Sequence, residues 1–293
     1  MLCRECPRNC GVDRTHTLGV CHSPQTAVVT RAAPHFWEEP PISGTKGSGT
    51  VFFAGCNLGC IYCQNAAISR SGQVGTAVTA EELRTIFLRL KQQGVHNINL
   101  VTPTHYTHVI EQALQEEIGL PVVYNCGGYE RVETLQTLEG KIQIYLPDFK
   151  YMDAIAATEY SAAPDYPTVA KAAILEMFRQ TGPCQFDENG LLTKGVLIRH
   201  MVLPGHTKNT LAVIDWVANT FQKGEVLFSL MSQYTPTKAV AEHKTLGRPI
   251  TQREYEKCRD YMFAAGIEDG FLQEPDSARS DYIPPFDGTG VMP

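Results

Sequence analysis

Three cysteines stand close together in the run GCNLGCIYCQN, residues 55–65, with the spacing C-x3-C-x2-C. Thiolates are the usual ligands of zinc and of iron–sulfur clusters. Cys56, Cys60 and Cys63 are one short of the four thiolates that a tetrahedral zinc ion or a four-iron cube takes. On a [4Fe–4S] cluster they would leave one iron open to an outside chelator. The amine and carboxylate of an amino acid suit that iron, because they offer a neutral nitrogen and an anionic oxygen.

A second group of cysteines lies at the amino terminus, with the spacing C-x2-C-x3-C-x10-C. Seven of the ten cysteines fall within the first 63 residues, and such clustering in a long chain favours metal ligation over the disulfides of secreted proteins. The four thiols suffice for a zinc site or for a second iron–sulfur cluster, and the spacing does not choose between the two. They are Cys3, Cys6, Cys10 and Cys21.

The composition is that of a globular protein with a sizeable core and an acidic balance. Of 293 residues, 43% are hydrophobic and 19% are charged, and the formal net charge is −6. This balance disfavours nucleic acid and anionic membranes as partners, because both attract a basic face. The sequence shows neither the apolar segment of a signal peptide nor an 18-residue apolar run. We therefore expect a cytoplasmic protein that does not associate with membranes.

Six short apolar runs have the character of strands that are buried on both faces. Each is rich in Val, Ile, Leu or Phe and is bounded by turn residues. The runs cover residues 49–55, 95–101, 120–125, 141–149, 195–203 and 225–231.

Helical patterns separate these runs, so that strand and helix alternate along the chain. In residues 80–93, apolar residues recur at i, i+3, i+4 and i+7 behind a capping box of Thr79 and Glu82. Six successive βα units predict a parallel sheet with right-handed crossovers, as an open sheet or as a full or partial barrel. The expected helices cover residues 80–93, 106–117, 130–138, 168–180, 207–222 and 252–265.

Polar residues gather at the carboxyl ends of the expected strands, where parallel α/β folds bind their ligands. Asp148 and Lys150 close an apolar strand, and Asn125 ends the strand before it. Charged residues in such a position are usually paired or functional. The sequence therefore predicts a binding site at this edge of the sheet.

The cysteine spacing, the aromatic Tyr62 before the last cysteine and the place directly after the first expected strand resemble the radical S-adenosylmethionine (radical SAM) superfamily. The resemblance implies that the open iron binds the amine and carboxylate of the SAM methionine. An electron from the cluster would cleave the S–C5′ bond, and the 5′-deoxyadenosyl radical would abstract a hydrogen atom. It further implies a reducing flavodoxin or ferredoxin as partner. We accordingly expect an α/β fold, a partial (β/α)6 TIM-like barrel with a cysteine-rich amino-terminal extension.

Within the superfamily, residues 45–290 resemble the activating enzymes of glycyl radical enzymes, among them pyruvate formate-lyase activating enzyme homologues. Those enzymes carry an Asp-Leu-Lys-type motif on strand four, which is Asp148-Phe149-Lys150 here, and an arginine on strand five, which is Arg199. The resemblance implies that Asp148 and Lys150 face the SAM. It also implies that Arg199 faces the SAM carboxylate or the substrate, and that Asn125 contacts the SAM amino group.

The sequence departs from the activating enzymes at two strand ends. The Gly-Gly-Glu that holds the SAM amino group after strand two is replaced by residues 102–105, so Thr102 or Thr104 would take over that contact. A histidine near the end of strand six is replaced by Gln233. No catalytic side chain is assigned. The implied SAM contacts are Tyr62, Thr102, Thr104, Asn125, Asp148, Lys150, Arg199 and Gln233.

Three functions follow from these residues. The first is a radical SAM enzyme acting on a protein, which the similarity to activating enzymes favours. The second is a radical SAM enzyme acting on a small metabolite, and the third is a non-enzymatic iron–sulfur or zinc protein on a degenerate barrel. Residues 1–44 would form the metal-binding extension and a connecting segment, and residues 45–293 the radical SAM barrel with a carboxyl-terminal tail.

The sequence also gives expectations for Cys126, for residues 35–44 and for the carboxyl-terminal tail. Cys126 is either a thiol that exchanges hydrogen atoms with a radical or a buried structural residue. Residues 35–44, with two acids and a Trp, form either a lid over the barrel mouth or a plain connecting loop. The tail, residues 274–293, is rich in Pro, Gly and Asp and is expected to run extended over the body.

Overall fold

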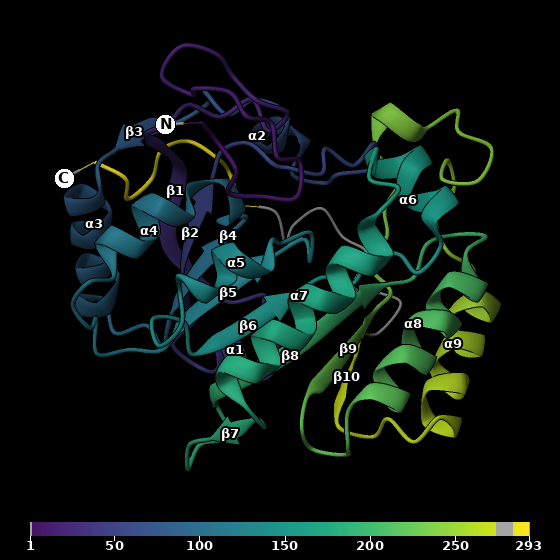
Figure 1. The fold of residues 1–293 in the computed structure, drawn as a ribbon. Helices are drawn as coiled ribbons and strands as arrows, with labels where there is room; N and C mark the ends of the chain where they lie inside the picture. The colour runs from purple at the N-terminus through teal and green to yellow at the C-terminus, as the bar shows by residue number, and fades with distance from the viewer. Residues whose placement is uncertain (1, 274–283, 293) are drawn as a thin grey trace.

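Six strands run parallel through the centre of one sheet (Figure 1). The structure is a computed structural model that describes residues 2–273 and 284–292. The six strands neighbour one another in chain order and match the six apolar runs of the sequence, which confirms the predicted α/β class. They are β2 (Ser48–Phe53), β4 (Ile98–Val101), β5 (Val122–Cys126), β6 (Ile144–Pro147), β8 (Leu192–Met201) and β9 (Leu227–Met231).

Further strands, which the sequence did not predict, extend this sheet. β1 (Ala27–His35) pairs antiparallel with β2, and β3 (Thr76–Val78) pairs antiparallel with β1. At the other side, β10 (Gly270–Leu272) is parallel to β9, and β7 (Gln185–Phe186) pairs with β8. The path of paired strands runs from β10 to β3, and these two end strands do not pair within the described residues. The sheet is therefore a partial, open barrel, as expected.

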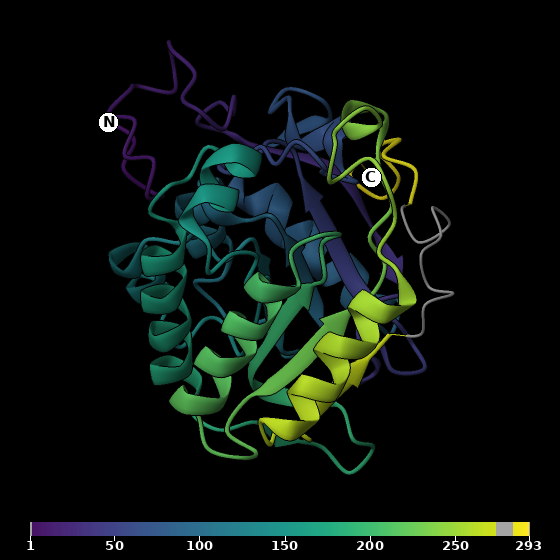
Figure 2. The same ribbon diagram turned by 90° about the vertical axis from the view of Figure 1, so that its right-hand side faces the viewer.

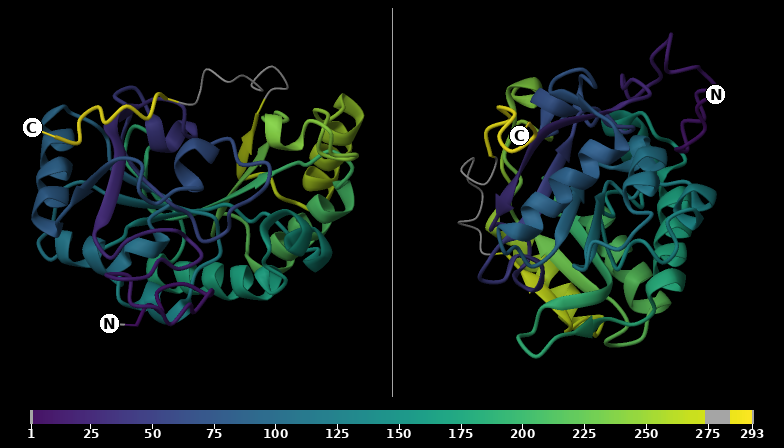
Figure 3. Two further views of the ribbon diagram at one scale, coloured as in Figure 1. Left: turned by 90° about the horizontal axis from the view of Figure 1, so that it is seen from above. Right: turned by 90° about the vertical axis from the view of Figure 1, so that its left-hand side faces the viewer.

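Six helices cover the outer side of the sheet. α8 and α9 lie side by side (Figure 2), and the view from above shows helices around the curved sheet (Figure 3). No helix among the described residues is long and apolar enough to cross a membrane. Each of the six overlaps a predicted helix, and they are α3 (Ala80–Gln92), α4 (Thr107–Ala113), α5 (Val132–Gln136), α7 (Tyr166–Thr181), α8 (Thr207–Thr220) and α9 (Gln252–Ala264).

The beginning of α3 is fixed by the capping box that the sequence indicated. The Glu82 amide donates to the Thr79 hydroxyl over 3.2 Å, and the Glu82 carboxylate accepts from the Thr79 amide over 2.7 Å. The two bonds satisfy amide groups that have no partner inside the helix. The apolar stripe of α3 then packs on the sheet, with Leu83, Ile86, Phe87 and Leu90 buried.

Short helices that the sequence did not predict lie near the strand ends. α6 (Ala154–Ser161) has no amphipathic pattern and begins where the Asp153 side chain accepts from the Ile155 amide over 2.8 Å. It ends at Ala162, which adopts the left-handed conformation with φ 49°. The others are α1 (Pro40–Ser43), α2 (Ala66–Ser69) and the 3-10 helices η1 (Thr104–Tyr106) and η2 (Lys238–Val240).

Residues 284–292 run along β1, next to α3 (Figure 1). The Ala32 amide donates to the Thr289 carbonyl over 2.9 Å, and the Gly288 amide donates to the Thr30 carbonyl over 3.0 Å. This part of the tail lies over the body, as expected, but it is not extended throughout, because the Val291 amide donates to the Gly288 carbonyl over 3.1 Å and closes a turn. Residues 274–283 and 293 lie outside the described residues.

Candidate active site

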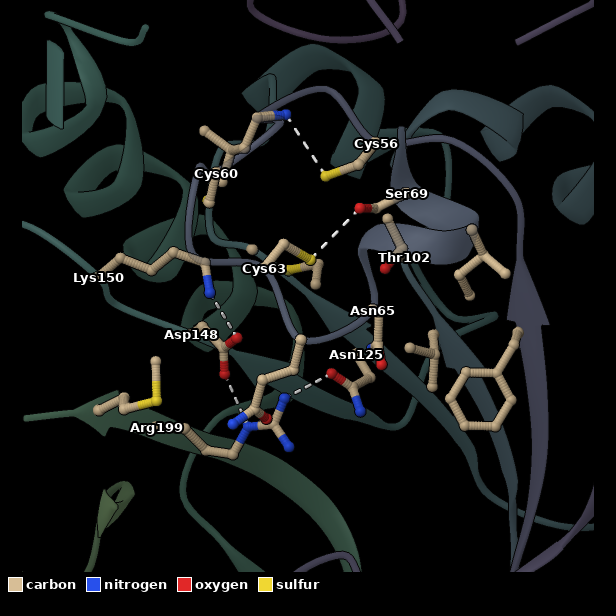
Figure 4. Close-up of a pocket in the computed structure, with 18 of the residues that line it drawn as sticks. Cys56, Cys60, Cys63, Asn65, Ser69, Thr102, Asn125, Asp148, Lys150 and Arg199 are labelled. Atoms are coloured by element: carbon tan, nitrogen blue, oxygen red, sulfur yellow. Dashed lines mark hydrogen bonds and ion pairs between the residues drawn. The ribbon is translucent and has the colours of Figure 1, made fainter. Parts of the chain in front are cut away.

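The cysteine loop follows β2 and borders a cavity of about 260 Å³ at the carboxyl ends of the parallel strands (Figure 4). Cys56, Cys60 and Cys63 all line this cavity, although only Cys60 is fully buried. Residues at the ends of β2, β4, β5, β6, β8 and β9 complete its wall. Parallel α/β folds bind ligands at this edge, so the cavity lies where the fold places a site.

Gly55 is the first residue of the cysteine loop, and its backbone conformation sets the direction of the loop. Its φ is +87°, a conformation that favours glycine. A Cβ atom there would lie 2.8 Å from the Cys21 carbonyl oxygen and would overlap the Ser23 hydroxyl. The amino-terminal segment therefore packs directly against the residue that precedes Cys56.

Hydrogen bonds surround the three sulfur atoms. The Leu58 amide donates to Cys56 Sγ over 3.4 Å, the Ser69 hydroxyl to Cys63 Sγ over 3.3 Å, and the Ser161 hydroxyl to Cys60 Sγ over 2.9 Å. Donors directed at sulfur stabilise thiolates and tune the clusters that they hold. α2 and α6, which supply the two serines, thus position the loop.

Tyr62 extends this network from inside the loop. It is buried and lines the cavity, and its hydroxyl lies 2.6 Å from that of Tyr151. The Tyr151 hydroxyl lies 2.8 Å from that of Ser161, which reaches Cys60. Burial raises the pKa of Tyr62 well above its usual value, so the phenol stays neutral.

Burial holds the thiols of Cys56 and Cys63 in their protonated form. Burial raises the pKa of Cys56 to about 12 and also raises the pKa of Cys63. All ten cysteines are free, so no disulfide uses them. Thiols of this kind are poor nucleophiles, whereas a bound metal removes their protons outright. The thiols of the cysteine loop therefore suit metal binding better than catalysis by a cysteine nucleophile.

A charged triad faces the loop across the cavity. Asp148 accepts from Lys150 Nζ over 2.8 Å through one oxygen and from Arg199 Nε over 2.8 Å through the other. Asp148 and Arg199 are paired by an isolated parallel bridge beyond β6, which sets their side chains next to each other. Figure 4 shows the three side chains between the cysteine loop and β8.

Arg199 joins this triad to Asn125, a predicted site residue, and to Glu38 and Glu39, which the sequence did not single out as site residues. Its remaining nitrogens donate to Asn125 Oδ1 over 2.7 Å and to Glu38 Oε2 over 2.9 Å. Glu38 also accepts from Asn125 over 3.1 Å, and Glu39 lies 3.8 Å from Arg199. Residues 35–44 were expected to be a lid or a connecting loop, whereas their acids form part of the cavity's charge network.

Each charge in this network is stabilised by its neighbours. Burial alone would raise the pKa of Asp148, but Arg199 and Lys150 together hold it below its usual value. Burial alone would lower the pKa of Lys150, and Asp148 more than offsets this effect, so the ammonium stays charged. Burial raises the pKa of Glu39 despite Arg199 nearby, which makes its charge the least stable of the group.

The other SAM contacts implied by the sequence separate into two groups. Thr102 and Gln233 line the cavity, and Thr102 does so with a φ of +59°, a strained value for a threonine. Thr104 is buried, is absent from the cavity wall among the described residues and donates to Glu130 over 2.7 Å. Cys126 is buried and contributes to the wall, which is compatible with either role given above.

Glu130 is a buried acid that sequence reasoning missed. Only 2% of it is exposed, and it accepts from the hydroxyls of Thr104 and Tyr124 over 2.7 and 3.1 Å. Burial raises its pKa to about 7, although these hydrogen bonds act in the opposite direction. In the sequence, Glu130 stands in a helical pattern that does not mark it as a buried acid. Its hydrogen-bond partners come from η1 and β5, outside that pattern.

Within the described part of the chain, the cysteine sulfurs do not meet at a single point. Among residues 2–273 and 284–292, no three His, Cys, Asp or Glu side chains converge closely enough to hold a metal ion. A single zinc ion requires such convergence. In a four-iron cube each thiolate binds its own iron, so sulfurs that border one cavity without meeting at a point fit a cube better.

The chain is similar to a curated protein in sequence and to solved structures in fold. It is similar to an uncharacterised protein of Methanocaldococcus jannaschii, at 28% identity over 268 residues that span 87% of this chain and 72% of the relative. No protein-family model matches the chain. The relative's name states no activity.

The fold match is with Streptococcus suis SuiB bound to precursor peptide SuiA, at a TM-score of 0.50 and 15% identity over 75% of this chain and 46% of that chain. This chain thus spans about half the length of SuiB, and the likeness shows a shared fold only. A domain of the pyruvate-formate lyase-activating enzyme from Bacteroides vulgatus ATCC 8482 also matches, at 14% identity over 67% of this chain and 91% of the domain. Its TM-score of 0.37 gives no specific support to an activating-enzyme type.

We predict that Asp148→Asn destabilises the fold more than Lys150→Met does. Asp148→Asn leaves Lys150 without a carboxylate and Arg199 with only those of Glu38 and Glu39, a loss of about 3–5 kcal/mol for a broken buried pair. Lys150→Met leaves Asp148 paired with Arg199 and should cost about 1.5–3 kcal/mol, as for one charged hydrogen bond. Urea unfolding at pH 7 measures both, with the exposed Lys208→Met as the control. An equal or larger loss in Lys150→Met would contradict the central place of Asp148.

We predict that Glu130 makes the stability fall as the pH rises from about 4.5 to 7. In that window the unfolded chain loses the proton of this carboxyl while the folded chain keeps it, so the unfolded state becomes more favourable. The full change is on the order of 3 kcal/mol. Urea unfolding at pH 4.5 and pH 8 should show this fall in the wild type and a smaller one in Glu130→Gln. The exposed Glu188→Gln is the control, and an identical fall in Glu130→Gln would refute the assignment.

Proposed function

We propose that this chain is a radical SAM enzyme that holds a [4Fe–4S] cluster on Cys56, Cys60 and Cys63. One observation carries the proposal: two groups of residues from distant parts of the sequence share one cavity. The first is the three-thiol loop after β2, and the second is the polar set that ends β5, β6 and β8. An iron–sulfur cluster with an open iron and an amino-acid-like ligand needs both groups within reach of each other.

The three thiols fit such a cluster in number, placement and environment. They border the cavity separately, each with a hydrogen-bond donor at its sulfur. With SAM bound at its open iron, the cluster would supply the electron that cleaves the sulfonium and so produce the radical that takes a hydrogen atom from the substrate. The chain's own residues would hold both cofactors, keep them dry and orient them.

Lys150, Asp148 and Asn125 would bind the methionine end of SAM. The Lys150 ammonium donates to Asp148, and Lys150 lines the cavity together with Cys60 and Cys63. A carboxylate at the open iron would be attracted to that ammonium. The oxygens of Asp148 and Asn125 would accept from the amino group, while Thr102 and Gln233 line the rest of the cavity.

Arg199 would position this site through its neighbours. Its guanidinium already donates to Asp148, Asn125 and Glu38. A planar donor held by three acceptors fixes their side chains at defined distances. We therefore assign Arg199 to the framework of the SAM site, and we leave Thr104 out because its hydroxyl is bound to Glu130.

The proposed substrate is a polypeptide loop, and the proposed electron source is a reduced flavodoxin or ferredoxin. The open edge between β10 and β3 supports a peptide substrate, because a partial barrel leaves its side accessible. A solved structure with this fold, SuiB, is bound to a precursor peptide, so the fold is able to receive one. The motifs Asp148-Phe149-Lys150 and Arg199 add the resemblance to enzymes that activate glycyl radical proteins.

We predict that replacing Cys56, Cys60 and Cys63 together by Ala removes about four iron atoms per chain, because the cube loses its ligands from the loop. Iron and sulfide are measured after anaerobic reconstitution. Cys258→Ala is the matched control, because that thiol is buried in the core away from the cavity. Iron content equal to that of the wild type would refute the cluster assignment.

We predict that the hydrogen atom abstracted by the enzyme comes from a protein. The chain is incubated with SAM, a reductant and a deuterated cell extract that has been separated into protein and small-molecule fractions. Deuterium should enter 5′-deoxyadenosine only with the protein fraction. Label from the small-molecule fraction alone would establish a metabolite substrate instead. Absence of SAM cleavage by the cluster-loaded chain would favour the non-enzymatic alternative.

A further inference from the structure

The amino-terminal segment, residues 2–26, precedes the first strand and has almost no regular structure of its own. Its only β pairing is the isolated bridge between Leu2 and Asp13. Ordering the backbone costs about 1–2 kcal/mol per residue, and a segment without helices, strands or disulfides recovers little of it locally. Small segments of this kind are usually stabilised by a metal or a covalent cross-link.

The backbone of this segment brings its first three cysteines together. The Cys3 amide donates to the Val12 carbonyl over 2.8 Å, and the Gly11 amide donates to the Cys3 carbonyl over 2.9 Å. These bonds place Cys3 beside Cys10. A tight turn closed by the Asn9 amide and the Cys6 carbonyl, with Asn9 at φ 45°, then brings Cys6 close to Cys10.

Cys21 joins the group from ten residues further on. The Val20 amide lies 3.5 Å from Cys10 Sγ, and a Cβ atom on Gly19 would approach that sulfur to 3.0 Å. Cys6 and Cys21 are each only 6% exposed, and Cys21 is close enough to Cys3 and Cys6 for charge on one sulfur to act on the others. Four thiols thus gather in a loop that no disulfide closes.

The thiols of this segment have the same local environment as those of the cysteine loop. The Glu5 and Arg8 amides hydrogen-bond the thiols two residues before them, Cys3 and Cys6. In the cysteine loop, the Leu58 and Asn65 amides do the same for Cys56 and Cys63. The spacing C-x2-C-x3-C is also the reverse of C-x3-C-x2-C. Both loops therefore wrap amides around sulfur in a way that suits thiolate ligands.

The segment is also docked on the cysteine loop. Arg8 donates to the Asn57 carbonyl over 2.7 Å and to the Ser161 carbonyl over 2.8 Å, and Ser161 is the donor to Cys60. The Cys21 carbonyl rests against Gly55, as described above. A cross-link within residues 2–26 would therefore hold the start of the cysteine loop, at Gly55 and Asn57, in place.

We infer that Cys3, Cys6, Cys10 and Cys21 bind a second iron–sulfur cluster, closed at all four corners by protein thiolates, that braces the cysteine loop. A single zinc ion is disfavoured, because no three described ligands converge on one point. Separate iron corners do not need that convergence. All four irons of such a cluster are bound by protein thiolates, so none is open to a substrate. The role of the cluster is therefore to fix the segment and, through Arg8 and Cys21, the loop that carries Cys56 and Cys60.

Two reciprocal variants of the full chain test this inference by metal content alone. The first carries Cys56→Ala, Cys60→Ala and Cys63→Ala, and the second carries Cys3→Ser and Cys6→Ser. After anaerobic purification, each should contain about four iron and four sulfide per chain, and the wild type about eight of each. Cys184→Ser is the control and should match the wild type.

Several results would overturn the inference. These are a wild type with about four iron atoms that the first variant loses, a first variant that holds zinc without sulfide, or a second variant that keeps all the iron of the wild type. A second variant that loses all iron would show that the two groups do not form separate sites. A wild type with about eight iron atoms supports two clusters even if a variant fails to fold. A wild type with about four iron atoms that the first variant keeps and the second loses would refute the proposed function and leave this inference standing.

Discussion

The burial of charge inside an apolar barrel is the constraint on which the site depends. A cation or an anion within such a wall is costly unless an opposite charge is in contact with it. Asp148 satisfies two cations at once, and Glu38 and Asn125 hold the far side of Arg199. The wall of the cavity is thus organised before any ligand arrives, so little reorganisation remains when a charged ligand binds.

The same network explains why residues 35–44 take the path they do. Glu38 and Glu39 are almost fully buried, and the segment that carries them must enter the interior to reach Arg199. The turn into α1 begins at the proline that follows, where a missing amide is no loss. A stretch that looks like a surface loop in the sequence therefore forms part of the binding wall.

The central part of the fold was predictable because each element carries its own signal. β5 matches a short apolar run and is buried throughout, and α3 shows its stripe and its capping box in consecutive residues. Short or weakly patterned elements such as β3 and α6 carry no such signal and form through contacts with their surroundings. In the site, Cys56 and Asp148 were found from spacing and position, whereas Glu38 and Glu130 were not. The buried environment of Glu38 and Glu130 forms only when distant segments of the chain meet, and a local sequence pattern does not indicate such contacts.

The open barrel raises a problem that closed barrels avoid, since each end of the sheet presents unpaired backbone groups. Such edges invite pairing with another chain and so promote aggregation. Here the strands at both ends, β3 and β10, are only three residues long, and beyond β3 the tail hydrogen-bonds to β1 at Thr30 and Ala32, which together leave few groups for an intruding strand to pair with. Short terminal strands thus allow the barrel to stay open at its side while the protein remains protected against edge-to-edge association.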